Sequence, residues 1–196
     1  MTRALDEVHD LIDTWEIDPA VETLRPATQL LATMAVGDPG RYDVLQVIAD
    51  HQSMRGEVDD ALATLDEAAG EPGADADLLM ATRIAYLIEA GRTDQAEPLL
   101  RDLRRRAADL SIEGIERVAE ALEQRGRLRE AMRWFTIALR DLDPSRDLPE
   151  LDEEEALLGR WRVREQLELP ADHYDLLARE IVELRRSRWA DTDWSD

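Results

Sequence analysis

Four glutamates recur at spacings of three, four and three residues within one short segment of the chain. They are Glu113, Glu116, Glu120 and Glu123. Because an α-helix turns once every 3.6 residues, this spacing places all four carboxylates on one side of a helix. Like charges at such separations repel by on the order of a few tenths of a kcal/mol per pair. The pattern predicts either a surface that attracts Arg or Lys side chains of a ligand or a solvated face of an acidic protein.

Residues suited to catalysis or cofactor binding do not form a recognisable pattern in this sequence. The chain contains no cysteine, which removes disulfides, thiolate metal sites and thiol catalysis. Its three histidines, His9, His51 and His173, show no metal-ligand or triad spacing, and no P-loop, dinucleotide-binding turn or nucleophile elbow is present. We therefore predict no catalytic residue, no metal, no cofactor and no enzyme activity, with a metal-dependent hydrolase as the least favoured alternative.

One acidic segment has some of the offsets of a calcium-binding loop. It spans residues 141–152 and carries Asp141, Asp143, Ser145, Asp147 and Asp152. Arg146 stands where such a loop needs glycine, and Pro144 interrupts the pattern. Because acidic interhelical loops often match such a pattern, we do not predict a calcium site here.

The overall charge limits the classes of partner. The chain has 45 acidic and 24 basic residues, a formal net charge of −21, and every basic residue is arginine. A field of this sign repels nucleic-acid phosphates and anionic membranes, and it favours basic partners. The amino terminus lacks the apolar stretch of a signal peptide, and the longest uncharged run, 26–37, is too short for a membrane span. We expect a cytoplasmic protein that contacts neither nucleic acid nor membrane directly.

Four sets of residues recur with a constant spacing of 35, which is the mark of a stacked helical repeat. The sets are Gly56, Gly91 and Gly126; Ala61, Ala96 and Ala131; Leu65, Leu100 and Phe135; and Ala68, Leu103 and Ala138. Each glycine stands between two amphipathic segments, where it ends the first helix by adopting left-handed geometry. Asp75 or Asp77 and Ser111 are the expected N-caps of two first helices.

The helices expected from this pattern fall into two regions. Residues 1–145 form a repeat array, with a divergent amino-terminal helix pair followed by repeats at about 42–75, 77–110 and 112–145. Residues 146–196 form a two-helix extension that covers the last apolar face of the stack and ends in a frayed tail. The fold class is all-α, a right-handed superhelical stack of helix-turn-helix repeats.

The repeats resemble the tetratricopeptide family. The best match is the segment "RGRLREAMRWFTIALRDLDP" together with the helix before it. The family's signature positions are filled by Ala119 of that helix and by Gly126, Ala131, Phe135 and Ala138 of the segment. The resemblance covers about residues 42–144. The family's first-helix tryptophan and tyrosine are missing, and its usual period is 34 residues. A weaker resemblance of residues 159–180 is to the repeat region of actinobacterial SEC-C-motif proteins, whose cysteine-rich metal module this chain lacks.

The resemblance implies that the first helix of each hairpin lines a concave, ligand-binding groove. The third repeat contributes the four glutamates, and the first two contribute Asp43, Gln46 and Asp50, and Ala81, Ala85 and Ile88. The Lys, Arg and Asn of the family's clamp for terminal carboxylates are absent. We predict an adaptor or scaffold that binds a basic or mixed basic-apolar segment of another protein. An acidic mimic that sequesters a nucleic-acid-binding protein and a self-associating, homo-oligomeric structural protein remain as alternatives.

Overall fold

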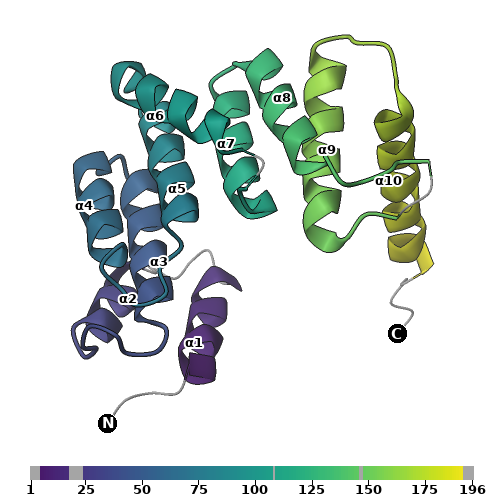
Figure 1. The fold of residues 1–196 in the computed structure, drawn as a ribbon. Coiled ribbons are helices and arrows are strands. Elements are labelled where there is room, and N and C mark those ends of the chain that lie inside the picture. Colours follow the sequence, from purple (N-terminus) through teal and green to yellow (C-terminus); the bar gives the residue numbers. More distant parts are fainter. Residues whose placement is uncertain (1–4, 18–23, 108, 146–147, 192–196) are drawn as a thin grey trace. The chain divides into compact units, whose positions relative to one another are not determined.

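Helices are the regular secondary structure of the described parts of the chain. The computed structural model describes residues 5–17, 24–107, 109–145 and 148–191, and within these ranges it contains ten α-helices and no strand (Figure 1). The helices are α1 (Leu5–Ile17), α2 (Leu24–Leu31), α3 (Arg41–Met54), α4 (Val58–Ala68), α5 (Ala76–Glu89), α6 (Thr93–Arg105), α7 (Ile112–Gln124), α8 (Leu128–Ala138), α9 (Leu151–Gln166) and α10 (His173–Asp191). The predicted all-α class is therefore confirmed.

The three recurring glycines occupy equivalent turns between paired helices. Gly56, Gly91 and Gly126 have φ values of 79°, 73° and 72°, a region that other residues rarely adopt. Each follows the last turn of the first helix, as expected for a glycine that ends a helix. The two predicted caps are also present, because the side chains of Asp75 and Ser111 accept hydrogen bonds from the first turns of α5 and α7.

The three recurring alanines are buried, two of them in helix pairs that pack together: Ala61 in the pair α3 and α4, and Ala131 in the pair α7 and α8. Ala61, Ala96 and Ala131 are each 0% exposed. Larger side chains of the same repeat, Leu65, Leu100 and Phe135, are buried beside them. Small residues at these positions let two helix backbones approach closely, which explains why the sequence repeats them.

Substituting Ala131 by leucine tests this packing. We expect Ala131→Leu to lower the free energy of unfolding by about 1–3 kcal/mol, because three added carbon atoms must displace close-packed neighbours. Urea unfolding followed by tryptophan fluorescence measures the change. Arg133→Leu, on the exposed side of the same helix, is the control and should change stability by less than about 0.5 kcal/mol. Equal effects of the two substitutions would contradict the repeat assignment.

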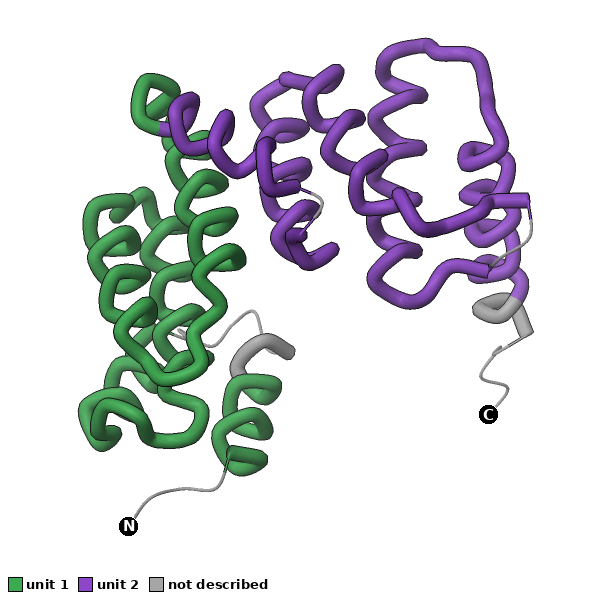
Figure 2. Tube along the Cα trace, viewed as in Figure 1, with its two compact units in different colours: residues 1–95 green, residues 96–196 purple. Residues whose placement is uncertain are grey.

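The chain divides into two compact units, Met1–Gln95 and Ala96–Asp196 (Figure 2). This division differs from the predicted boundary at residue 145, because it falls near the start of α6 and splits the second predicted repeat. The carboxy-terminal helices belong to the same unit as the third repeat: α9 packs against α7 and α8, and α10 packs against α9. A methyl group on Gly159 of α9 would lie 2.5 Å from the Phe135 ring, so only glycine permits this approach.

A buried ionic network joins α9 to α10 in the second unit. Arg160, 6% exposed, donates to both oxygens of Asp172 at 2.6 and 3.1 Å and to Asp175 at 3.3 Å. Arg164 donates to Asp175 at 2.9 Å, and the Tyr174 ring lies 4.8 Å from the Arg160 guanidinium. Burial alone would raise the pKa of Asp172, but the hydrogen bond from Arg160 and the nearby charges of both arginines hold it below its usual value.

Candidate functional site

The predicted glutamate stripe on α7 meets two further carboxylates on α9. The charges of Glu120, Glu155, Asp152 and Glu113 all act on Glu116, which lies half-buried between them. We call these five residues the carboxylate cluster. They come together because α7 and α9 pack against each other within the second unit. The structure thus brings three of the four predicted glutamates into one negative surface and adds Asp152 and Glu155 to it.

Glu116 is the most strongly perturbed member of the carboxylate cluster. Partial burial, followed by repulsion from Glu120, Glu155, Asp152 and Glu113, raises its pKa to about 7. Within the described parts of the chain, Glu116 forms no hydrogen bond or ion pair. The protein therefore provides no cationic partner for the ionised form of Glu116, and a cationic ligand would favour that form.

Glu123, the fourth predicted glutamate, is already neutralised by an arginine of α9. Arg162 donates two hydrogen bonds to its carboxylate, both 2.7 Å long, and Gln166 donates a third at 3.1 Å. These residues line a hollow of about 410 Å³ together with Glu120 and Gln124. Of the two carboxylates in this lining, Arg162 binds that of Glu123 but not that of Glu120. Glu120 therefore carries the negative charge of the hollow, and it also belongs to the carboxylate cluster.

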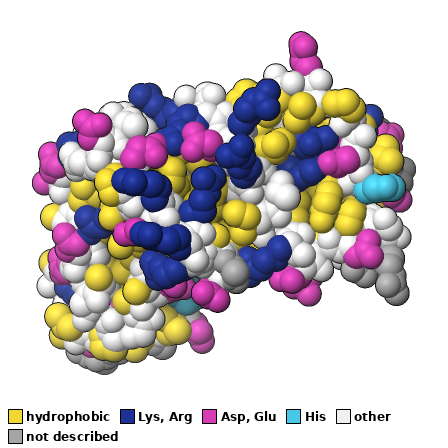
Figure 3. Space-filling view, turned by 45° about the horizontal axis from the view of Figure 1, so that its top comes forward, with side chains coloured by type: hydrophobic (Ala, Val, Ile, Leu, Met, Phe, Trp, Pro, Cys, Tyr) yellow, Lys and Arg dark blue, Asp and Glu magenta, His cyan; other side chains and the backbone are white. Residues whose placement is uncertain are grey.

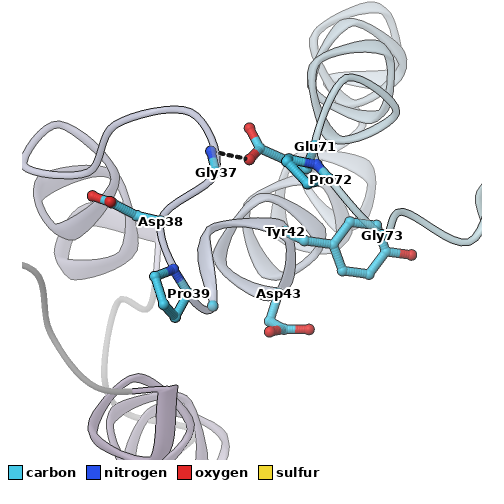
Figure 4. Close-up of a pocket in the computed structure, with 9 residues that line it drawn as sticks. Gly37, Asp38, Pro39, Tyr42, Asp43, Glu71, Pro72 and Gly73 are labelled. Carbon is cyan, nitrogen blue, oxygen red and sulfur yellow. Dashed lines mark hydrogen bonds between the residues drawn. The ribbon is translucent and has the colours of Figure 1, made fainter.

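A second hollow, of about 230 Å³, lies in the first unit where two turns meet the start of α3 (Figure 4). Tyr42, two prolines and the predicted site residue Asp43 are part of its wall. Glu71 holds the two turns together, because its buried carboxylate accepts from the Gly37 amide at 2.9 Å and pairs with the buried Arg41. Asp43 is partnered by an exposed residue of α1, His9, whose Nε2 lies 3.1 Å from its Oδ2.

The other predicted groove residues of the first unit differ in their accessibility. Gln46 and Asp50 are partly exposed on α3, and Asp50 accepts a hydrogen bond of 2.7 Å from the hydroxyl of Tyr86 on α5. By contrast, a set of apolar residues on α5 is buried, at 4% exposure or less: Ala81, Ala85 and Ile88. A ligand cannot reach these three side chains in this structure, so the apolar part of the expected ligand face is not available.

Two groups at these sites were not expected from the sequence. Asp152 and Glu155 show no sequence pattern that links them to the glutamates of α7, and the dipole at the start of α9 is enough to explain acids at these positions. His9 has no metal-ligand or triad spacing in the sequence, and the structure places it in a hydrogen bond with Asp43. Neither relationship has a sequence signal, because each joins helices that are far apart in the chain.

The described residues offer neither a metal-binding cluster nor a membrane-spanning helix. In that part of the chain, no group of three or more His, Asp or Glu side chains is arranged to hold a metal ion. Asp147 of the calcium-like segment lies outside the described residues, and the Asp143 carboxylate accepts from the Ser145 amide at 3.0 Å. None of the helices, as far as they are described, is long and apolar enough to cross a membrane.

Comparison with known proteins does not identify a family. No protein-family model matches the chain, and no curated protein matches it. A solved structure described as "MamA AMB-1 P212121" is similar, with 19% sequence identity and a TM-score of 0.43 over 83% of this chain and 92% of that one. Similarity at this level does not indicate a function, and the resemblance of residues 159–180 to SEC-C-motif proteins remains a prediction.

Proposed function

We propose that this protein is an interaction scaffold whose carboxylate cluster binds a basic segment of another protein. The observation that carries the proposal is the state of Glu116, a half-buried carboxylate surrounded by four others, with its pKa raised to about 7. Natural ion-pair networks alternate their charges, as Arg162 and Glu123 do nearby. In the carboxylate cluster, Arg117 pairs with Glu113 at 3.8 Å and Arg185 pairs with Glu155 at 2.8 Å, whereas Glu116 has no such partner among the described residues. A bound cation would therefore relieve the repulsion that acts on Glu116.

The ligand chemistry follows from the shape and charge of this surface. Arginine suits it best, since the planar guanidinium donates two parallel hydrogen bonds to one carboxylate. One basic side chain would pair with Glu116, and a second would enter the hollow beside Glu120. Exposed pairs such as that with Glu120 would mainly increase the association rate, whereas the half-buried pair with Glu116 would slow dissociation.

The first unit offers further polar positions for the same kind of ligand. Asp43, at the wall of the smaller hollow, and Gln46 and Asp50 on α3 remain proposed contacts. The apolar anchor expected at Ala81, Ala85 and Ile88 is not part of the proposal, because those side chains are buried. The ligand is therefore proposed to be basic rather than mixed basic and apolar.

A labelled octa-arginine peptide tests the proposal by fluorescence anisotropy at low salt. We expect Glu116→Gln with Glu120→Gln to weaken binding by at least about tenfold, because two carboxylate–guanidinium pairs are lost. The matched control, Glu7→Gln with Glu180→Gln, removes the same charge from two exposed positions outside the cluster and should change affinity less than about twofold.

Two results of this experiment would contradict the proposal. If both double variants bind equally well, the peptide recognises net charge, as the acidic-mimic alternative requires. If the wild-type protein does not bind the peptide with saturation, the carboxylate cluster is a solvated face. Circular dichroism spectra of both variants show whether the helices are retained.

A further inference from the structure

Arginine side chains gather on the exposed side of α8 and on the adjoining side of α6. Arg129, Arg133 and Arg140 are spaced by four and seven residues, which places them in one row along α8 and the residues just after it. All three are exposed, as are Arg101 and Arg104 of α6. Dark blue arginine side chains are prominent on the face drawn in Figure 3. We call these five residues the arginine face, and all of them belong to the second unit.

Three contacts show that the α6 and α8 parts of the arginine face adjoin. Arg127, just before α8, pairs with Glu97 of α6 at 2.7 Å. Glu130 of α8 has a lowered pKa, first because Arg127 donates to it and also because the charges of Arg104 on α6 and Arg133 on α8 lie near. Arg140 extends toward the backbone that follows α6, with its guanidinium 3.4 Å from the Ala107 carbonyl oxygen. The arginines of both helices therefore form one surface.

Three of the five arginines of this face have no hydrogen-bonded or ion-paired partner in the described parts of the chain. Arg104, Arg129 and Arg133 form no hydrogen bond or ion pair within the described residues, although the chain has 45 acidic residues for 24 arginines. The acids that lie nearby are already occupied, because Glu97 and Glu130 pair with Arg127 and Asp141 pairs with Arg140.

The helix dipole does not account for this arrangement. Cations are favourable at the carboxy-terminal ends of helices, which explains Arg104 in the last turn of α6. Arg129 is the second residue of α8, at the positive end of that helix, where a cation is unfavourable. Arg129 is exposed at this position, Arg133 follows one turn later, and neither has a carboxylate partner among the described residues. This arrangement points to a ligand.

We propose that the arginine face docks a short acidic segment of a partner protein. The row from Arg129 on α8 to Arg140, two residues past the end of that helix, extends about 16 Å at about 1.5 Å per residue. An extended peptide of about five residues spans that length. Glutamate or aspartate side chains of the segment pair with the unpartnered guanidinium groups, two hydrogen bonds to each carboxylate. This docking surface does not depend on the carboxylate cluster and takes a ligand of opposite charge.

A short acidic peptide fits this face better than a nucleic acid does. The charge of a nucleic-acid strand continues past any 16 Å surface, at roughly one phosphate per 3.4 Å of a duplex strand. Beyond the arginine face the strand would meet the field of a protein with net charge −21, which repels it. A peptide can confine its negative charge to the few residues that contact the arginines.

A fluorescein-labelled penta-glutamate peptide is the probe, and its binding to the full chain is measured by fluorescence anisotropy in 50 mM salt. The wild-type protein should bind it with saturation, and Arg129→Glu with Arg133→Glu should weaken binding at least tenfold. The matched control, Arg25→Glu with Arg55→Glu, makes the same charge change at exposed positions of the first unit and should weaken binding less than twofold. Glutamate in the first turn of α8 suits the helix dipole, so the variant should retain its fold.

Four results would overturn the proposal. Wild-type protein that does not bind the peptide with saturation, or an equal loss in both double variants, would show that the arginine face is not a specific surface. A 12-nucleotide single-stranded DNA that binds more tightly than the peptide, and that loses binding in Arg129→Glu with Arg133→Glu, would assign the face to nucleic acid. The protein could also self-associate in a sedimentation experiment. If Arg129→Glu with Arg133→Glu abolishes that self-association and the peptide does not, the arginine face binds a second copy of the chain.

Discussion

Replacing Asp175 with alanine is expected to lower the free energy of unfolding of the second unit by about 3–5 kcal/mol. The carboxylate of Asp175 is nearly inaccessible and accepts hydrogen bonds from Arg160 and Arg164. Without it, two largely buried guanidinium groups would share one remaining carboxylate, that of Asp172. A buried charge that has lost its partner costs far more than a surface pair gains.

Urea unfolding followed by tryptophan fluorescence measures this effect, since Trp134 and Trp161 both belong to the second unit. Arg179→Ala is the control: it removes an exposed pair with Glu165, 3.5 Å long, and should cost less than about 1 kcal/mol. A loss of less than 1 kcal/mol in Asp175→Ala would mean that α10 is not held to α9 by this network.

The local parts of the fold could be predicted because each depends on residues that are close in sequence. The turn at Gly126 has a φ of 72°, which favours glycine, and Ala131 occupies a buried position where the 35-residue period repeats a small residue. The caps at Asp75 and Ser111 depend on hydrogen bonds to residues two or three positions away. Such features have a pattern that can be read in one segment at a time.

The contacts between distant helices could not be predicted in this way. Glu116 and Asp152 are on different helices, and nothing in either segment indicates that α7 and α9 meet. The pairing of Arg160 with Asp172 and Asp175 crosses a loop, and in the sequence these residues resemble any others in a chain rich in arginine and acids. Burial of the apolar groove residues, such as Ala85, likewise follows from packing that periodicity does not specify.

The same limit explains why the ligand face was predicted only in part. The glutamate spacing correctly places Glu116 and Glu120 on a common side of α7, but it does not show that Arg162 neutralises Glu123. It also does not show that α9 supplies two more carboxylates. The acidic character of the candidate site is therefore stronger around Glu116 and weaker around Glu123 than the sequence alone indicates.

The titration of Glu116 should appear in the stability of the free protein. Its folded pKa of about 7 lies above the ordinary value of 4.5, so protonation stabilises the fold below pH 4.5 and this contribution is lost as the pH rises to about 7. Glu116→Gln keeps this side chain neutral at every pH, so the variant does not lose this stability as the pH rises. Because the carboxylate is only half-buried and solvent screens it, the expected gain at pH 8 is about 1 kcal/mol, with no difference from wild type near pH 4.

Binding of octa-arginine to the carboxylate cluster should strengthen by roughly tenfold as the pH rises from 5.5 to 7.5. The bound guanidinium favours the ionised carboxylate, so binding lowers the pKa of Glu116 from about 7 and a proton must leave when the peptide binds below that pH. The peptide keeps its charge throughout this range, which means that the change in affinity reports the protein. Above pH 8 the affinity should no longer change.

Glu116→Gln distinguishes this mechanism from a general effect of pH on charge. The groups that face Glu116 are Glu113 and Glu120 from its own helix and Asp152 and Glu155 from α9, and the fully ionised cluster is what attracts the peptide. In the variant, the affinity should be lower at pH 7.5 and should change less than about twofold between pH 5.5 and 7.5. If the variant keeps the tenfold dependence, another group titrates on binding, and Glu116 is not the residue that the basic ligand contacts.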